Sequence, residues 1–222
     1  MAFNIAIDGP AGAGKSTIAK AVADRLGMIY IDTGAMYRAM ALFMLREKVS
    51  PGDEKAVSAK CKDAYITILH ENGEQKVRLN GENVNAFLRT EEVGNMASVT
   101  STYQAVREKL VELQKQLAAE CDCVMDGRDI GTCVLPHAQV KIYLTADSKV
   151  RAKRRFDELT QKGVACDLEQ ILRDVEERDY RDMHREHSPL RQAEDAVLVD
   201  SSNMGIEEVI AEILGICEKK DK

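Results

Sequence analysis

One short stretch near the amino terminus constrains this chain more than any other. It runs Gly9-Pro10-Ala11-Gly12-Ala13-Gly14-Lys15-Ser16-Thr17 and fits the pattern Gly, four residues of any type, Gly, Lys, and Ser or Thr. Residues 3–7 before it have the apolar character of a short buried strand, and residues 17–26 after it carry apolar side chains at helical spacing. The sequence therefore predicts a strand, a glycine-rich loop and a helix, the context in which this pattern binds phosphate groups.

Each part of this loop has a physical role in binding an oligophosphate. Glycines allow backbone φ values that turn several N–H groups inward, and the helix that begins near Lys15 adds the positive end of its dipole. Lys15, which we expect to be exposed in the loop, can reach the outer phosphates, and the Ser16 hydroxyl can ligate Mg²⁺. All nine residues from Gly9 to Thr17 are therefore candidate phosphate-binding residues.

Composition indicates an ordinary globular protein. The 222 residues are 45% hydrophobic and 31% charged, which suits one α/β domain with a sizeable core. Lys and Arg number 31 against 37 Asp and Glu, a net charge of −6, and no basic block favours binding to nucleic acid. No apolar run approaches membrane-spanning length, and the first residues enter a strand rather than a signal sequence, so we expect a cytoplasmic protein.

The cysteines indicate neither a disulfide framework nor a zinc site. They are scattered, without C-x-x-C spacing or histidine partners nearby. The six are Cys61, Cys121, Cys123, Cys133, Cys166 and Cys217. We expect them to be reduced and mostly buried.

The rest of the chain predicts alternating strands and helices. Further short strands are expected at residues 28–31, 123–125, 140–144 and 196–199, and helices at 35–48, 147–162, 167–187 and 205–217. Because each apolar strand is followed by a helix, we predict a parallel sheet of five strands with helices on both faces and ligands at the carboxyl ends of the strands. The aspartates that fall just past such ends are Asp8, Asp32, Asp126 and Asp200.

Residues 64–84 follow a different period. Their side chains alternate, and Asn72-Gly73 and Asn80-Gly81 separate the alternating runs, which is the strongest hairpin signal that a sequence contains. We therefore predict a three-stranded antiparallel insert. Asp53 is expected to cap a short helix before it, and the helical tract from Thr90 to Glu120 should break near residues 98–102.

Two charged helices follow the fourth strand. Arg151, Arg154 and Arg155 share one face of the first helix by their spacing. Arg178, Asp182 and Arg185 share one face of the second by the same rule. A solvated surface is the default explanation of such charge runs, so the charges alone assign neither helix a role.

The phosphate-binding loop leaves kinase, ATPase and GTPase open. Phosphoryl transfer needs positive groups around the moving charge, and Arg38, Arg128 and Arg185 can supply them. No Asn-Lys-x-Asp motif for reading guanine occurs, which counts against a GTPase. Two hypotheses stay open: a kinase for a small acceptor such as the monophosphate UMP or AMP, and a nucleotide-dependent switch that hydrolyses ATP slowly and acts through partners.

The sequence closely resembles the bacterial cytidylate (CMP) kinases, members of the nucleoside monophosphate kinase group. The resemblance runs end to end and is carried by several stretches. They are Ile7 to Thr17, Asp32-Thr33-Gly34-Ala35-Met36-Tyr37-Arg38, Leu88-Arg89-Thr90, Val106-Arg107, Asp126-Gly127-Arg128-Asp129-Ile130-Gly131-Thr132, and Glu177-Arg178-Asp179 through Arg185. The resemblance implies a P-loop NTPase fold and an enzyme that transfers the γ-phosphate of ATP to CMP or dCMP with Mg²⁺.

The resemblance also implies roles for individual residues. Lys15, Arg128 and Arg185 would be catalytic. Arg38, Arg128 and Arg185 would hold the CMP phosphate, Arg178 and Asp182 the ribose, and Ser98, Arg107 and Asp129 the cytosine, with Thr33 a further substrate-binding candidate. Arg151, Arg154 and Arg155 would bind ATP together with Gly9 to Thr17. Asp126 would hold Mg²⁺ from its second coordination shell beside Ser16.

By the same resemblance, residues 1–222 form one kinase domain. Its core would comprise 1–62, 95–146 and 164–222, with the antiparallel insert at 63–94 in the monophosphate-binding part and a helical lid at 147–163 that closes over ATP and excludes water. No general base is required, because the acceptor phosphate, with a second pKa of about 6, is largely ionised at neutral pH. The expected partners are ATP and CMP or dCMP alone, without nucleic acid or membrane, and we expect a monomer.

Overall fold

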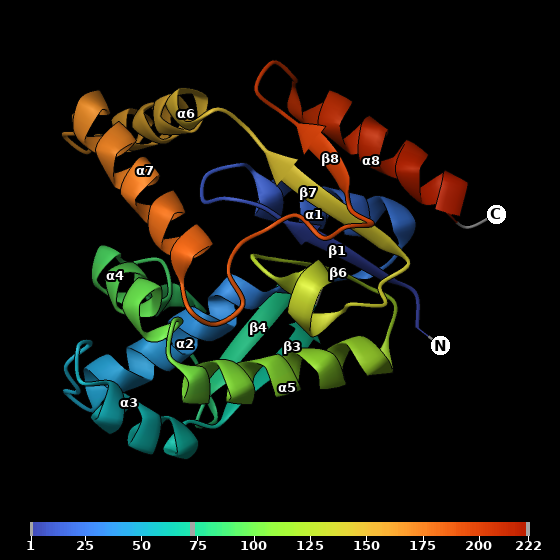
Figure 1. Ribbon diagram of the computed structural model, residues 1–222. Helices are drawn as coiled ribbons and strands as arrows, with labels where there is room; N and C mark the ends of the chain where they lie inside the picture. The colour runs from blue at the N-terminus through green and yellow to red at the C-terminus, as the bar shows by residue number, and fades with distance from the viewer. Residues whose placement is uncertain (1, 72–73, 221–222) are drawn as a thin grey trace. The chain divides into compact units, whose positions relative to one another are not determined.

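The computed structural model of the protein describes residues 2–71 and 74–220 (Figure 1). The chain divides into two compact units. The first, here called the hairpin unit, is formed mainly by Ile29–Asp122. The second, here called the glycine-loop unit, is formed by Phe3–Met28 and the residues from Cys123 onward.

Strand β1 (Asn4–Asp8) is the centre of the glycine-loop unit. It pairs in parallel with β6 (Cys123–Gly127) and with β7 (Val140–Thr145), and β7 pairs in parallel with β8 (Val197–Asp200). With β2 (Ile29–Asp32), these strands form a five-stranded sheet in the order β2-β6-β1-β7-β8. The predicted five-stranded parallel sheet is therefore confirmed.

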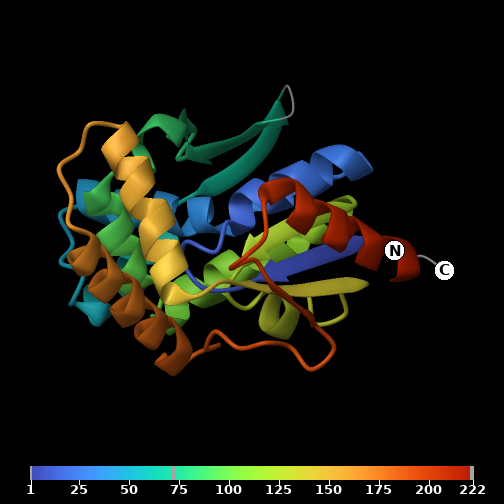
Figure 2. The ribbon, with the colours of Figure 1, turned by 90° about the horizontal axis from the view of Figure 1, so that it is seen from above.

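Two helices of this unit pack along the sheet. Helix α1 (Lys15–Leu26) contacts β6, helix α8 (Ile206–Lys220) contacts β7, and the two helices lie side by side (Figures 1 and 2). Val22 of α1 and Ile213 of α8 are completely buried, whereas Leu26 and Ile206, at the ends of the two helices, are exposed. Both helices therefore have the amphipathic character that the sequence predicted.

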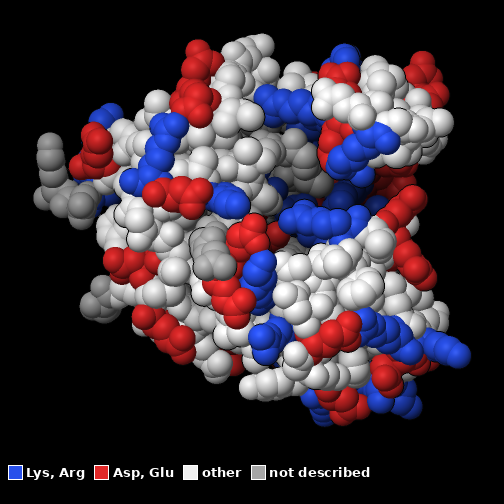
Figure 3. All heavy atoms as spheres, turned by 180° about the vertical axis from the view of Figure 1, so that it is seen from behind, with Lys and Arg blue, Asp and Glu red and all other residues white. Residues whose placement is uncertain are grey.

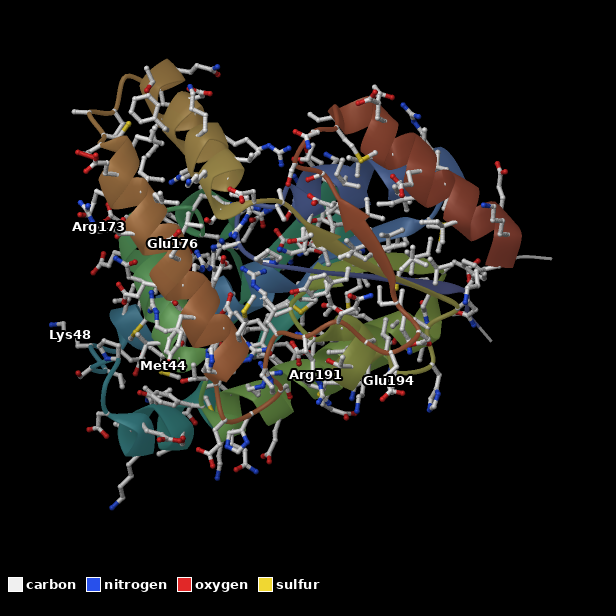
Figure 4. The ribbon with its side chains drawn as sticks, turned by 45° about the horizontal axis from the view of Figure 1, so that its top comes forward. Met44, Lys48, Arg173, Glu176, Arg191 and Glu194 are labelled. Atoms are coloured by element: carbon white, nitrogen blue, oxygen red, sulfur yellow. The ribbon has the colours of Figure 1, made fainter. Side chains whose placement is uncertain are left out.

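Helices α6 (Ser148–Gln161) and α7 (Leu168–His184) pack against each other as a pair (Figure 2). Asp147 and Asp167 cap them by accepting hydrogen bonds from the first turn of each helix. Glu176, labelled in Figure 4, accepts a hydrogen bond of 3.1 Å from the Ser148 hydroxyl across the pair. The segment that leads from α7 back to β8 carries Arg191 and Glu194, also labelled there.

Helix α7 ends at His184, three residues before the predicted end. A turn replaces the last residues because Arg185 Nε donates to the Ser188 carbonyl at 2.7 Å and Leu190 N donates to the Asp182 carbonyl at 2.8 Å. Arg185 has an extended backbone beyond the helix. The prediction that Arg185 shares a helical face with Arg178 and Asp182 is therefore wrong.

Helix α2 (Thr33–Arg46) forms the core of the hairpin unit, where its methionines Met36, Met40 and Met44 are buried. It packs against α4 (Glu91–Thr100) and α5 (Gln104–Glu120), which are separated by a break at residues 101–103, close to the predicted position. Helix α3 (Glu54–Lys60) follows the Asp53 cap that the sequence predicted, and a 3₁₀ turn at Cys61–Asp63 leads from it into the insert.

The antiparallel insert consists of β3 (Ile66–Glu71), β4 (Glu74–Leu79) and β5 (Glu82–Asn83), paired in that order and followed by a 3₁₀ turn at Asn85–Phe87. Asn80 and Gly81 both have positive φ values, 50° and 87°, as the two central residues of a type I′ turn require. The three-stranded insert is therefore confirmed. The other predicted turn, Asn72-Gly73, lies outside the described residues.

Surface and thiol properties agree with a globular protein. Basic and acidic side chains are interspersed over the face seen in Figure 3. No described helix combines the length and apolar character needed to cross a membrane. All six cysteines are free thiols, as predicted, but only Cys61, Cys123 and Cys217 are buried, so the expectation that most are buried holds for half of them.

Candidate active site

The loop between β1 and α1 has the backbone that phosphate binding requires. Gly9, Gly12 and Gly14 have φ values of 152°, 76° and 85°. At Gly9 no side chain fits, since a Cβ would lie 1.9 Å from the Leu144 carbonyl oxygen. Gly14 caps α1, whose first turn leaves backbone N–H groups without helical partners. The strand, glycine loop and helix are present as predicted, and the loop ends in an anion-binding helix terminus.

Lys15 is the first residue of α1 and is buried, with an exposed fraction of 6%. Its Nζ donates to the Pro10 carbonyl at 2.7 Å, so the side chain folds back across the loop. The prediction that Lys15 is exposed is therefore wrong. Burial lowers the pKa of Lys15 to about 7, and the positive charge of Arg128 acts in the same direction.

Ser16 and Asp126 form the candidate magnesium site. The Ser16 hydroxyl donates to Asp126 Oδ2 at 3.0 Å, and Asp126 is a buried residue of β6. Hydroxyl and carboxylate oxygens are the hard ligands that Mg²⁺ prefers. The two side chains therefore fit the ion that the sequence assigned to them.

Asp8 ends β1 and is buried, with an exposed fraction of 5%. Its two carboxylate oxygens accept hydrogen bonds from Ile130 N and Gly131 N, each at 2.7 Å. These donors begin a π-helical turn, Ile130–Val134, which the sequence did not predict. Burial raises the pKa of Asp8 to about 6, although both backbone hydrogen bonds limit the rise. The sequence signals for this residue were its place between a strand and the glycine loop and its position in the family stretch from Ile7 to Thr17.

Four candidate substrate residues form two ion pairs in the glycine-loop unit. Arg128 Nε donates to Asp182 Oδ2 at 2.8 Å. Arg185 Nη2 donates to Asp129 Oδ1 at 3.2 Å, and both side chains of this second pair are buried. Burial opposes ionisation of Asp182, but Arg128, together with Arg178 and Arg185, lowers its pKa. Asp182 in turn raises the pKa of Arg128 against the effect of burial. The structure therefore brings three predicted arginines around Asp182.

The three arginines of α6 have different partners. Arg151 is buried and donates to the carbonyls of Ala146 and Ala11 at 2.8 and 2.9 Å and to Asp179. Arg154 donates to the Ser201 carbonyl at 2.6 Å, and the exposed Arg155 pairs with Glu158. Of the three, Arg151 is the one that contacts the glycine loop.

The remaining candidates lie in the hairpin unit. Thr33 is the buried first residue of α2. Arg38 lies in the same helix, and its Nη1 is close to Gly34: a Cβ added at Gly34 would lie 3.2 Å from it. Ser98 is a half-buried residue of α4. Arg107 is buried on α5, with its guanidinium carbon 5.9 Å from the centroid of the Tyr37 ring.

Arg89 belongs to the same unit and had no predicted role. It pairs with Asp32 at 2.9 Å, and Asp32 also caps α2 by accepting from Ala35 N at 3.0 Å. The sequence placed Arg89 in a family stretch but gave no signal for this partner, because the two residues are 57 positions apart.

The similarity of this chain to known proteins extends over nearly its whole length. The family described as cytidylate kinase matches residues 5–219. The cytidylate kinase of Lactobacillus johnsonii is 51% identical over 99% of this chain and 96% of its own length. The cytidylate kinase of Caldicellulosiruptor bescii is also 51% identical, over 98% of this chain and 96% of its own length.

One solved structure gives support for the fold alone. An uncharacterized protein from Eubacterium ventriosum superposes with a TM-score of 0.52 at 11% identity, covering 97% of this chain and 98% of that protein.

Proposed function

The chain belongs to the cytidylate kinase family and is an ATP-dependent CMP kinase, and we propose which of its residues carry out the transfer. The two rival hypotheses, a kinase for a different monophosphate and a nucleotide-dependent switch, do not explain identities of 51% to cytidylate kinases over nearly the whole chain. The observation that carries the proposal is the junction of the glycine loop with α1, where Lys15 and Ser16 follow the loop directly.

On the donor side, the ATP phosphates bind the residues from Gly9 to Thr17. Their negative charge favours the ammonium form of Lys15, which then stabilises the charge that develops during transfer. Arg151 supports the loop through its hydrogen bond to the Ala11 carbonyl. Arg154 and Arg155 are proposed to contact ATP when residues 147–163 close as a lid.

The reaction uses Mg²⁺ with ATP, and Ser16 would ligate the ion directly while Asp126 acts through a water molecule. When bound, the ion neutralises charge on the phosphates. The Ser16 hydroxyl already donates to Asp126, so the carboxylate orients the hydroxyl oxygen that the ion would use.

On the acceptor side, Arg38, Arg128 and Arg185 bind the CMP phosphate. In the described structure, Arg128 bonds to Asp182 and Arg185 bonds to Asp129. These carboxylates already orient the two guanidinium groups to which the phosphate would bind. Arg178 and Asp182 then bind the ribose, and Thr33 contributes to the same substrate. No side chain needs to act as general base, because the CMP phosphate is already ionised.

Ser98, Arg107 and Asp129 are proposed to select cytosine. The Asp129 carboxylate accepts from the cytosine amino group but would face a lone pair of the uracil carbonyl. Opposed or unpaired polar groups in a site built for one pattern discriminate by roughly 10⁴. We therefore expect CMP and dCMP to be substrates and UMP to be a much poorer one. The enzyme is further proposed to be a cytoplasmic monomer.

An ADP-release assay over CMP, dCMP, UMP and AMP tests this function. We expect release to depend on CMP or dCMP and the UMP value of kcat/KM to be lower by about 10⁴. Asp129→Ala should reduce turnover of CMP far more than that of UMP. A rate independent of the monophosphate would indicate a switch, and equal losses on both substrates would show that Asp129 does not read the base.

A further inference from the structure

We propose that Asp8 is a positioning residue for the acceptor nucleotide: its carboxylate fixes the loop that carries Arg128 and Asp129, so that CMP binding depends on it and ATP binding does not. This inference rests on the roles proposed above for Arg128 and Asp129. Asp8 would act through these residues, without contacting a substrate.

The hydrogen bonds of Asp8 suit a carboxylate and no other small side chain. Each oxygen accepts one backbone N–H, from Ile130 and Gly131, at 2.7 Å in a buried position. An amide at this position would offer one oxygen and turn its NH₂ group toward the other N–H. A buried N–H that loses its acceptor is destabilising, so both hydrogen bonds define the position of this backbone.

The two hydrogen bonds of Asp8 fix the residues that lie between strand β6 and Ile130. In the parallel register of β1 and β6, Asp8 lies beside Gly127. The chain is thus held at Gly127 by strand pairing and again at residues 130–131 by the Asp8 side chain. Arg128 and Asp129 are the two residues between these fixed points, so the directions of their side chains follow from both.

A second contact closes this loop from the other side. A Cβ at Gly131 would lie 3.2 Å from Lys141 Cδ and 3.4 Å from Asp8 Oδ2. Lys141 is itself buried and donates from Nζ to the Pro136 carbonyl at 2.6 Å and to Asp195 at 2.9 Å. The loop therefore lies between two anchored side chains, Asp8 and Lys141, and its position depends on both.

The glycine loop has anchors of its own, although it begins at the next residue. Gly9 packs against the Leu144 carbonyl, and the Pro10 and Ala11 carbonyls accept from Lys15 and Arg151. Loss of the Asp8 carboxylate leaves all three contacts in place. The predicted effect is therefore selective for the acceptor.

Steady-state kinetics of Asp8→Asn test this selectivity. We expect KM for CMP to rise about 10- to 100-fold, the range that a displacement near 1 Å produces, while KM for ATP changes less than about twofold. The preference for CMP over UMP should narrow, because Asp129 loses its position. Asp200→Asn is the matched control: Asp200 ends a strand of the same sheet and accepts from Ser202 N at 2.9 Å, but its loop carries no residue proposed to bind CMP. Its KM for CMP should be unchanged.

A folded Asp8→Asn enzyme with an unchanged KM for CMP, or with equal rises for ATP and CMP, would overturn the proposal. If thermal melting shows that this variant does not fold, Gly131→Ala decides, since its Cβ presses on the same contact and should raise KM for CMP alone by a few fold. Asp129→Ala in the same assay distinguishes a failure of the proposed role of Asp129 from a failure of the inference about Asp8. If it leaves the CMP preference intact, the proposed role of Asp129 fails; if it narrows the preference and Asp8→Asn does not, the inference about Asp8 fails.

Discussion

The loops that follow β1 and β6 and the helix pair α6–α7 belong to the same unit but are held in different ways. In the loops, buried polar groups bond to one another and to the backbone, through Asp8, Lys15 and Asp126. In the helix pair, the buried residues are Arg151 and Ala152 of α6 and Ile171 of α7, and most other charges are exposed.

This difference indicates which part can move. Elements with few buried contacts open at low free-energy cost, whereas buried hydrogen bonds must all break together before a loop moves. We infer that the loops hold the reacting groups in place and that α6 and α7 supply the motion that closes the site. Arg151 connects the two parts, since it bonds both to Asp179 of α7 and to the Ala11 carbonyl.

The largest expected effect is in the fixed part. Lys15→Ala should lower kcat by more than about a hundredfold, by analogy with other single electrostatic donors, because the variant lacks the charge proposed to stabilise the transition state. The melting curve should be unchanged or shifted upward, since a buried ammonium is removed. Lys153→Ala on α6 is the control and should be fully active, because Lys153 is exposed. Retained activity of Lys15→Ala would mean that the loop is not the catalytic centre.

Arg185→Ala should affect both function and stability. Asp129 loses its buried partner, which costs about 3 kcal/mol of the free energy of unfolding. We expect kcat to fall and KM for CMP to rise, each by about tenfold or more, and lysine to substitute poorly because it lacks the planar fork.

Urea unfolding and initial-rate kinetics measure these effects of Arg185→Ala, with the exposed Arg181→Ala as control. The same substitution at Arg38 should also reduce turnover. If either alanine variant raised only KM for CMP and left kcat unchanged, that arginine would act in binding alone.

Asp8 of the fixed loops and Asp182 of α7 should respond to pH in opposite ways. The pKa of Asp8 is about 6 in the folded state against 3.8 in the unfolded state, so its ionisation destabilises the fold increasingly between pH 4 and 6. The difference in unfolding free energy between Asp8→Asn and the wild type should therefore shift in favour of the variant by about 3 kcal/mol over that interval. Asp182 has a lowered pKa, so its stabilising effect is present above pH 3.8 and is lost as the pH falls. Equal pH dependence of Asp8→Asn and Asp182→Asn would contradict this.

Arg151→Lys should weaken the connection between the fixed loops and the helix pair α6–α7. Its effect on activity should be smaller than those of the substitutions above. Lysine lacks the planar fork with which Arg151 bonds to the Ala11 carbonyl and to both Asp179 oxygens. We expect KM for ATP to rise by about tenfold and KM for CMP to change little. Faster proteolysis within α6 and α7 would accompany this change, and Lys153→Ala again serves as the control. A rise in KM for CMP that equals the rise for ATP would indicate that Arg151 supports the whole site.

Local chemistry explains what could be predicted from the sequence. The glycine loop, the Asn80-Gly81 turn and the Asp53 cap depend on a few adjacent residues, and all three are present in the structure. The long-range contacts were not predictable. Asp8 bonds to residues more than 120 positions away, and the π-helical turn to which those residues belong has no local sequence pattern.

Two sequence predictions were wrong for related reasons. Lys15 was expected to be exposed because it is charged and lies in a loop, but the Pro10 carbonyl gives its ammonium a buried partner. Arg185 was placed on a helical face because the spacing continued, but the carbonyl of Ser188 draws the side chain into a turn. In both cases a hydrogen bond to a backbone carbonyl decided the conformation, and the pattern of side chains gives no signal of such a bond.

Hydrogen–deuterium exchange of backbone amides, with and without ATP and CMP, tests the central claim most directly. In the free protein, the amides of Ile130 and Gly131 should exchange slowly because Asp8 binds them, while amides of α6 and α7 exchange through frequent local opening. Adding both nucleotides should slow exchange in α6 and α7 and leave residues 126–134 nearly unchanged. Slow exchange in α6 and α7 before nucleotide is added, or a protective effect confined to residues 126–134, would contradict the division into fixed loops and moving helices.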